Sequence, residues 1–233
     1  MAAVGARSAG PDQRGERLST NLKISAALVA AFVVTVAVLL GVNNSGADDT
    51  GTAEAGGAPV VREDSHQLSA AADDRVTLVE FLDFECEACK AAYPFVEQLR
   101  DDYDGRVTFV ARYFPMPGHA NAENAAVAVE AAARQGRFED MYHRMYETQT
   151  EWGERQDSQA DVFRGFAEGM GLDMADYDAA VGDPTTLERV LRDREDGLAL
   201  GVEGTPTFFL NGEKVEAQTT DEFIELIDAA LAD

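Results

Sequence analysis

Cys86 and Cys89 are the only cysteines of the 233-residue chain, and together they form one Cys-x-x-Cys motif. The motif follows an apolar run and opens a stretch of helical periodicity, which predicts that both thiols lie at a helix N-terminus. Unpaired backbone N–H groups and the helix dipole stabilise a thiolate at such a position. We therefore expect Cys86 to be a nucleophile, and Cys89 to resolve a mixed disulfide by intramolecular attack.

Two other uses of a cysteine pair are disfavoured. A structural disulfide gains stability from the length of the loop it closes, and this loop is too short to gain much. A zinc site needs four ligands, whereas the chain adds only His66, His119 and His143, none of them spaced as a ligand pair. The sequence therefore predicts no metal site and no cofactor.

The residues around the motif predict the elements that position it. Residues 75–82 form an apolar, β-branched run that is typical of a buried central strand. Residues 87–103 carry apolar side chains at helical spacing, with Pro94 expected to kink the helix. Residues 106–113 predict a second strand. Two strands joined by a helix indicate a parallel βαβ unit, with the motif at its strand-to-helix turn.

The rest of the chain is predicted to be helical first and then to return to strands. Helical segments are expected at residues 120–134, 138–149, 160–170, 177–181 and 184–200, the last with Asp183 as its N-cap. Asn211–Gly212 is typical of a hairpin turn between strands at 207–210 and 213–217. A helix at 221–231 completes the order βαβ, helical insert, ββα.

The N-terminal region predicts a membrane anchor. Residues 24–42 carry no charged side chain, and as a helix they would span about 28 Å, close to the ~30 Å hydrocarbon core of a bilayer. Basic residues dominate before this segment and Asp48 and Asp49 follow it, which indicates a cytoplasmic tail at 1–23. We expect a single transmembrane helix at 24–42 and a flexible linker at 43–59. A cleaved signal peptide is the alternative, and either one exports the domain at 60–233.

The charge balance is strongly acidic. The chain has 43 acidic and 19 basic residues, a formal net charge of −24. Such a surface repels nucleic acid and anionic membranes, so we expect neither as an electrostatic partner. The composition suits either general solubility or a salty habitat.

Four pieces of the chain resemble DsbA-like thioredoxin-fold proteins. Leu78–Cys89 (LVEFLDFECEAC) resembles their strand and active-site turn, and Arg112–His119 (RYFPMPGH) resembles the entry to their helical insert. Leu198–Gly212 (LALGVEGTPTFFLNG) resembles their cis-proline segment, and the C-terminal helix completes the match. The resemblance covers about residues 60–233. It implies an α/β thioredoxin fold interrupted by an all-helical insert at about 118–200, here preceded by the single transmembrane helix.

The resemblance also implies roles for particular residues. The Thr205–Pro206 peptide bond is expected to be cis, which would bring the Thr205 backbone beside the two sulfurs. Glu80, on the strand before the motif, is implied as the buried acid that moves the proton of the resolving thiol. Asp83 is a second candidate for that acid, and we expect His119 to cap or line the first helix of the insert.

The dipeptide between the cysteines departs from the family pattern. It is Glu87-Ala88, whereas the most oxidising members have Pro-His. Glu85 and Glu87 should disfavour a thiolate at Cys86 by repulsion, with Lys90 as a partial offset. We therefore expect a less acidic Cys86 and a more reducing potential than the Pro-His type has.

The resemblance implies a thiol–disulfide oxidoreductase that introduces disulfide bonds into secreted or cell-envelope proteins. Its substrates would be reduced, unfolded exported chains, and a quinone-linked membrane partner of the DsbB or VKOR type would reoxidise it. A reductase or isomerase that uses the same site is the alternative, and a peptide-binding module is a third hypothesis. We expect a monomer at the cell membrane with its domain on the extracytoplasmic side, or a secreted protein if the N-terminal segment is cleaved.

Overall fold

The computed structural model describes residues 57–73 and 75–232. The expected cytoplasmic tail (1–23), the expected anchor (24–42) and the expected linker up to residue 56 lie outside the described residues. No helix in the described ranges is both long and apolar enough to cross a bilayer.

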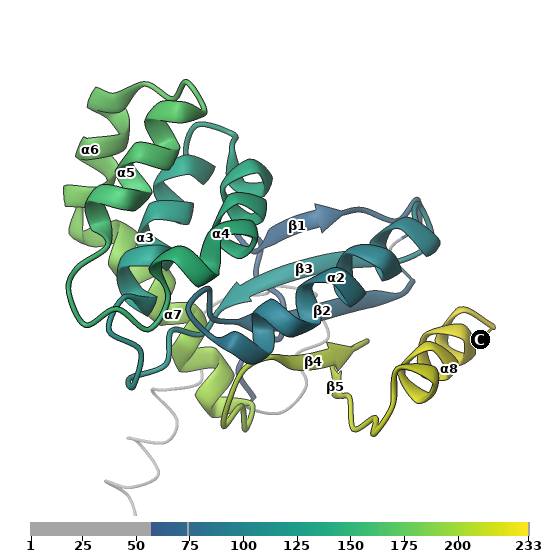
Figure 1. Ribbon diagram of the computed structural model, residues 1–233. Helices are drawn as coiled ribbons and strands as arrows, with labels where there is room; N and C mark the ends of the chain where they lie inside the picture. Colours follow the sequence, from purple (N-terminus) through teal and green to yellow (C-terminus); the bar gives the residue numbers. More distant parts are fainter. Residues whose placement is uncertain (1–56, 74, 233) are drawn as a thin grey trace, which may run out of the picture. The chain divides into compact units, whose positions relative to one another are not determined.

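A mixed sheet forms the centre of the described domain, with the strand order β1-β3-β2-β4-β5 (Figure 1). Its strands are β1 (His66–Ser69), β2 (Thr77–Leu82), β3 (Thr108–Tyr113), β4 (Thr207–Leu210) and β5 (Glu213–Lys214). β2 and β3 are parallel and are joined by helix α2 (Glu87–Asp102), which confirms the predicted βαβ unit. β4 is antiparallel to β2 and forms a hairpin with β5, which is shorter than the predicted strand at 213–217.

Strand β1 is the element that the sequence did not predict. It pairs antiparallel with β3, with His66 opposite Ala111, at the edge of the sheet. Only Leu68 of its four residues is buried. The segment therefore has neither the apolar run nor the alternation that marks a strand in a sequence.

Five helices lie between β3 and β4 in the described chain. They are α3 (Ala122–Ala133), α4 (Phe138–Trp152), α5 (Ala160–Gly169), α6 (Met174–Gly182) and α7 (Pro184–Ala199). In Figure 1, α3 to α6 gather beyond one end of the sheet and α7 returns toward β3. The last helix, α8 (Thr220–Ala232), packs Phe223 against Phe95 of α2. The predicted order βαβ, helical insert, ββα is confirmed.

Strand β2 is buried on both faces, and its alternation decides which side chains lie under α2. Leu78 and Leu82 belong to the core beneath α2 and α8, whereas Val79 and Phe81 belong to the core on the opposite face. Because side chains alternate along a strand, Glu80 lies on the same face as Leu78 and Leu82. The sheet thus places one carboxyl group in the apolar layer below the helix that carries the cysteines.

The opposite face of the sheet is covered by the end of α7. Phe81 and Phe114 pack edge to face there, with ring centroids 6.4 Å apart. A Cβ atom at Gly197 of α7 would lie 2.7 Å from the Phe114 ring. The absence of a side chain at Gly197 therefore allows α7 to approach the sheet closely.

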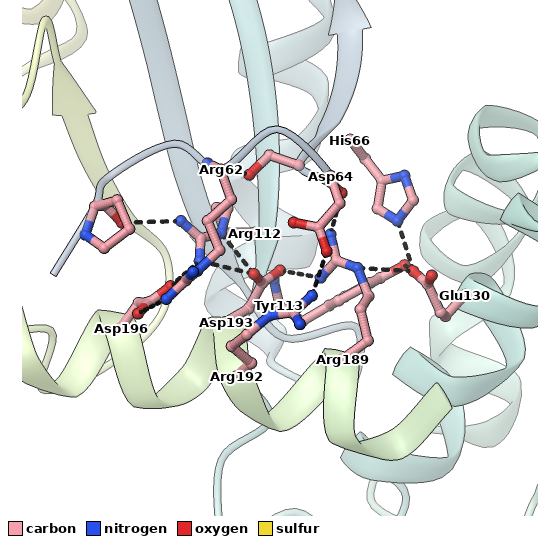
Figure 2. A network of polar contacts seen from close by, with 12 residues as sticks. Arg62, Asp64, His66, Arg112, Tyr113, Glu130, Arg189, Arg192, Asp193 and Asp196 are labelled. Carbon is pink, nitrogen blue, oxygen red and sulfur yellow. Dashed lines mark hydrogen bonds and ion pairs between the residues drawn. The ribbon is translucent and has the colours of Figure 1, made fainter. Parts of the chain in front are cut away.

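A buried network of charged side chains joins the chain before β1 to β3 and α7 (Figure 2). At its centre, Arg112 of β3 is fully buried. Its Nε and Nη2 atoms donate to Asp193 at 2.7 Å and to Asp196 at 2.5 Å. Its Nη1 atom donates to the carbonyl oxygens of Pro59 at 3.1 Å and Val60 at 2.7 Å. Arg112 therefore holds the first described residues against α7.

The same network continues to the helical insert. Arg189 of α7 donates to the second carboxylate oxygen of Asp193 at 2.5 Å and lies 3.4 Å from Glu130 of α3. Glu130 also accepts from the Tyr113 hydroxyl at 3.1 Å and pairs with His66 at 2.6 Å. Strands β1 and β3 and helices α3 and α7 therefore share one set of buried charges.

Removal of the central cation tests what this network contributes. Arg112→Leu should lower the free energy of unfolding by about 3–5 kcal/mol, because Asp193 and Asp196 would lose the guanidinium between them while remaining buried. Urea denaturation measures this change. The matched control is Arg164→Leu, which removes an exposed ion pair with Asp178 and should have a much smaller effect. Equal losses in the two variants would contradict the assignment.

Candidate active site

Cys86 and Cys89 lie at the start of α2, as the sequence predicts. Cys86 is the N-cap residue, with an extended backbone (φ −69°, ψ 123°), and Cys89 lies in the first helical turn. Both are free thiols in this structure. Cys86 keeps 9 % of its surface exposed whereas Cys89 has 0 %. Only Cys86 can therefore be reached by a second protein.

The surroundings of Cys86 favour its thiolate. Its pKa is lowered to about 5, first by the hydrogen bond from the Cys89 side chain. Burial opposes this effect, while hydrogen bonds from the backbone N–H groups of Cys89 and Ala88 add to it. Burial raises the pKa of Cys89, as do its hydrogen bond to Cys86 and the nearby charge of Glu80. At neutral pH the reduced site therefore holds one thiolate and one thiol.

The Thr205–Pro206 peptide bond is cis, the geometry that the resemblance implies. The carbonyl oxygen of Thr205 lies 3.3 Å from the sulfur of Cys86. Strand β4 starts at Thr207, directly after Pro206. The backbone beside the reactive sulfur is thus continuous with a strand of the central sheet.

Glu80 lies where the resemblance implies a buried acid. It is 5 % exposed, and its Oε2 atom has no hydrogen-bond partner among the described residues. Its pKa is raised to about 8, first by burial and then by the charges of Glu97 and Cys86. Glu80 can therefore hold a proton near neutral pH.

Asp83, the second candidate for that acid, has a carboxylate that is fully engaged in hydrogen bonds. Its carboxylate accepts hydrogen bonds from the backbone N–H groups of Glu85 at 2.8 Å and Met116 at 2.9 Å. It also lies 2.5 Å from the Nδ1 atom of His119. Asp83 thus organises the turn that leads into Cys86, and His119 pairs with it instead of capping the first insert helix.

Glu85, one expected source of repulsion at Cys86, is held by distant segments of the chain. Its carboxylate is buried and accepts hydrogen bonds from the backbone N–H groups of Asn121 at 2.6 Å and Glu154 at 3.1 Å. Those two donors stabilise the carboxylate, and the sequence could not reveal these contacts. Glu87 is exposed, and its hydrogen bond with Glu154 raises the pKa of that residue. Whether the site is less acidic than the Pro-His type stays a prediction.

Gln149 of α4 is a site residue that the sequence analysis missed. Its side-chain nitrogen donates to the carbonyl oxygens of Phe84 at 2.7 Å and Cys86 at 2.9 Å. It is 4 % exposed. It shares a helix face with the buried Tyr142 and Tyr146, and that spacing is the only sequence signal that could have indicated it. Through Gln149 the helical insert fixes the active-site turn.

A cavity of about 330 Å³ lies beside Pro206. Its apolar wall comes from α2, β4 and α8, with polar groups at the rim, and its lining includes Phe95, Phe208, Val215, Phe223, Lys214 and Gln218. The cavity can receive an apolar side chain of a segment that passes the cis-proline. The described ranges contain no group of three histidine, cysteine, aspartate or glutamate side chains placed to hold a metal ion.

The raised pKa of Glu80 predicts a pH-dependent stability. The folded protein keeps this proton up to about pH 8, whereas the unfolded chain releases it near the ordinary 4.5. As the pH rises from 5 to 8, wild type should lose stability relative to Glu80→Gln, by up to about 1.4 kcal/mol per pH unit. Urea denaturation measures this difference. Both proteins should be in the disulfide form, in which neither cysteine has a thiol that can titrate. The exposed Glu123→Gln should show no such trend, and a pH-independent difference for Glu80→Gln would contradict the role.

Loss of the Gln149 amide tests the link between insert and turn. Gln149→Met keeps the side-chain volume but leaves the carbonyl oxygens of Phe84 and Cys86 short of a donor. We expect the unfolding free energy to fall by about 1–3 kcal/mol, and alkylation of Cys86 by iodoacetamide to change in rate. Gln98→Met is the control, since Gln98 is exposed and contacts only Asp102 in its own helix. Equal behaviour of the two variants would contradict a positioning role.

Comparison with known proteins gives two kinds of relatives. A segment of a Na⁺/H⁺ antiporter, NhaA 1, from Mycolicibacterium vanbaalenii is 35 % identical over 156 residues, which is 65 % of this chain and 24 % of that protein. The chain thus spans about a quarter of the length of this curated relative. Among solved structures, a thioredoxin-like oxidoreductase from Silicibacter pomeroyi has a TM-score of 0.62 at 24 % identity, covering 74 % of this chain and 95 % of that one. BdbD from Bacillus subtilis has a TM-score of 0.62 at 21 % identity, covering 71 % and 92 %.

The family follows from the sequence model of the thioredoxin family, which matches residues 69–229. That range includes both cysteines, Glu80 and Pro206. The solved structures add that the fold, with its helices between β3 and β4, is shared with DsbA-like proteins. The family expected from the sequence is therefore confirmed. The chain belongs to the thioredoxin family, and its fold is that of DsbA-like proteins.

Proposed function

We propose that this protein is a disulfide donor for exported proteins. The observation that carries the proposal is the lowered pKa of Cys86, about 5, beside a Cys89 that stays protonated. A stabilised thiolate stabilises the reduced form of the pair, and this makes the disulfide a stronger oxidant. The reactive cysteine of thioredoxin has a pKa of ~7, and that of the strong oxidant DsbA has a pKa of ~3.5. A lowered pKa at Cys86 therefore supports the donor direction.

The geometry supports the following sequence of steps. A substrate thiolate attacks the sulfur of Cys86, the exposed member of the pair, and breaks its bond to Cys89. The departing Cys89 thiolate takes a proton, which the buried Glu80 supplies. A second substrate thiolate then attacks the mixed disulfide, the substrate leaves with its disulfide, and Cys86 remains as the stabilised thiolate.

The surface beside Cys86 fits an extended substrate. The Thr205 backbone at the sulfur and the apolar cavity at Pro206 together offer backbone pairing and one side-chain site. An unfolded chain exposes the backbone groups and apolar side chains that such a surface binds, whereas a folded protein buries most of them. We therefore propose reduced, unfolded chains as substrates.

The location and the membrane partner belong to the same proposal. The apolar residues 24–42 support export, either as an anchor or as a cleaved signal segment. The similar segments within proteins named Na⁺/H⁺ antiporters support a site of action at a membrane. A disulfide donor needs an oxidant after each cycle, and we propose a quinone-linked membrane oxidase of the DsbB or VKOR type.

The equilibrium with glutathione tests the direction of the reaction. We expect the full-length protein in detergent to have a reduction potential near or above the ~ −180 mV of protein disulfide isomerase. A value near the ~ −270 mV of thioredoxin would overturn the donor role and identify a reductase that uses the same pair.

Two variants accompany that measurement. Cys86→Ser should oxidise a reduced dithiol peptide no faster than buffer does, because the accessible sulfur is gone. Cys89→Ser, incubated with the disulfide form of the same peptide, should accumulate a mixed disulfide that is visible by mass spectrometry. Cys86 attacks and breaks the peptide disulfide, and no Cys89 thiol remains to release Cys86 from the peptide. If Cys86→Ser binds the peptide as tightly as wild type does, and wild type oxidises the peptide no faster than this variant, the result would instead support a peptide-binding module.

A further inference from the structure

The dipeptide between the cysteines supplies no positive charge to the Cys86 thiolate. Glu87 and Ala88 occupy those positions. Lys90, the nearest basic residue in the sequence, places its ammonium group 5.5 Å from the centre of the Tyr93 ring, further along α2. A cation that stabilises the thiolate must therefore come from another segment.

His119 is tied directly to the turn that carries Cys86. It lies between β3 and α3, and its Nδ1 atom is 2.5 Å from the carboxylate of Asp83. The Asp83 side chain is fully buried, while that of His119 keeps 33 % of its surface exposed. The backbone carbonyl oxygen of Asp83 accepts the Cys86 N–H at 3.1 Å. One residue thus holds both the imidazole and the N-cap of α2.

The charged groups around this imidazole favour its protonated form. Burial lowers the pKa of His119, but the hydrogen bond and charge of Asp83, with contributions from Cys86 and Glu85, raise it overall. Glu87 and Glu154 lie with His119 and Glu85 around a cavity of about 160 Å³. The acidic side chains around His119 therefore come from the β2–α2 turn, from α2 and from the segment that follows α4.

An electrostatic interaction between two sites is reciprocal. If the Cys86 thiolate favours a proton on His119, the imidazolium favours the thiolate by the same free energy. The acids around the cavity act on Cys86 in the opposite sense, so the imidazolium also shields the sulfur from them.

We infer that His119, held by Asp83, is the positioning residue whose positive charge stabilises the Cys86 thiolate, in place of a cation between the cysteines. The inference rests on the proposed thiol–disulfide exchange at Cys86, and it gives the second substrate proton a place to go. When a substrate dithiol reduces the pair, the sulfur–sulfur bond breaks and two electrons pass to the protein. The substrate releases two protons as its own disulfide forms. Cys89 takes one proton, and the other goes to His119 where this ring is neutral, or to solvent where it is already protonated.

Titration of the two cysteines tests this inference without any substrate. In the reduced full-length protein, the absorbance of the thiolate at 240 nm reports Cys86, because Cys89 titrates far above it. We expect His119→Gln to make Cys86 a threefold to tenfold weaker acid. The equilibrium constant with glutathione should shift toward a more reducing site by the same factor, and a tenfold change equals about 30 mV. His119→Lys should recover part of both losses, which a purely structural role would not predict.

The matched control is His143→Gln. His143 is similarly half-buried, and its partners are Tyr93, Glu97 and Glu139. We expect this variant to leave the acidity of Cys86 unchanged. An unchanged Cys86 titration in a folded His119→Gln protein would overturn the inference, whatever the direction of the enzyme's reaction.

A second measurement uses the wild-type protein and needs no folded variant. The pKa of the His119 ring, followed by NMR, should be higher in the reduced protein than in the disulfide form, because only the reduced form carries the thiolate. Equal values in the two states would overturn the inference. The donor role fails separately, through the reduction potential of the wild-type protein.

Discussion

The active site depends on one buried carboxylate, that of Asp83. It accepts hydrogen bonds from two backbone N–H groups, one in the turn before α2 and one in the turn after β3, and it pairs with His119. A buried carboxylate without such partners would be costly, so the two turns are held together by the need to satisfy it. The N-cap position of Cys86 follows, because the backbone carbonyl of Asp83 also accepts the Cys86 N–H.

The helical insert acts on the same turn from the other side. Gln149 binds two of its carbonyl oxygens, and the backbone of the insert binds the carboxylate of Glu85. The insert is thus part of the machinery that shapes the reactive sulfur. Its position depends in turn on the charges around Arg112, which connect β3, α7 and the first described residues (Figure 2). A change in that network can therefore be transmitted to the active-site turn.

The two cysteines have very different pKa values because they differ in burial and in hydrogen bonding. Cys86 is partly exposed and receives several hydrogen bonds, so its charged form is favoured. Cys89 and Glu80 lie in the apolar layer under α2, where burial raises both pKa values. At neutral pH the Cys86 thiol is therefore ionised, while Cys89 and Glu80 keep their protons. The sheet makes this division, because strand alternation directs Glu80 toward α2.

Elements with a periodic or compositional signal could be predicted from the sequence alone. The apolar run of β2, the helical spacing after Cys86 and the hairpin at Asn211–Gly212 are each marked by residues that lie within a short stretch of chain, so local preferences predict them. The resemblance to known proteins added the cis bond at Pro206 and the buried position of Glu80. The short edge strand β1 was missed because its residues carry no such pattern.

Contacts between distant segments could not be predicted, because they depend on the tertiary fold. Asp83 with His119, Glu85 with Asn121, Gln149 with Cys86, and Arg112 with Asp193 each join residues more than thirty positions apart. Local sequence gives no sign of such pairs, since a buried polar side chain resembles an exposed one until its partner is known. The position of the two thiols at a helix N-terminus could thus be predicted from the sequence, whereas the buried polar groups around them are brought together by the fold.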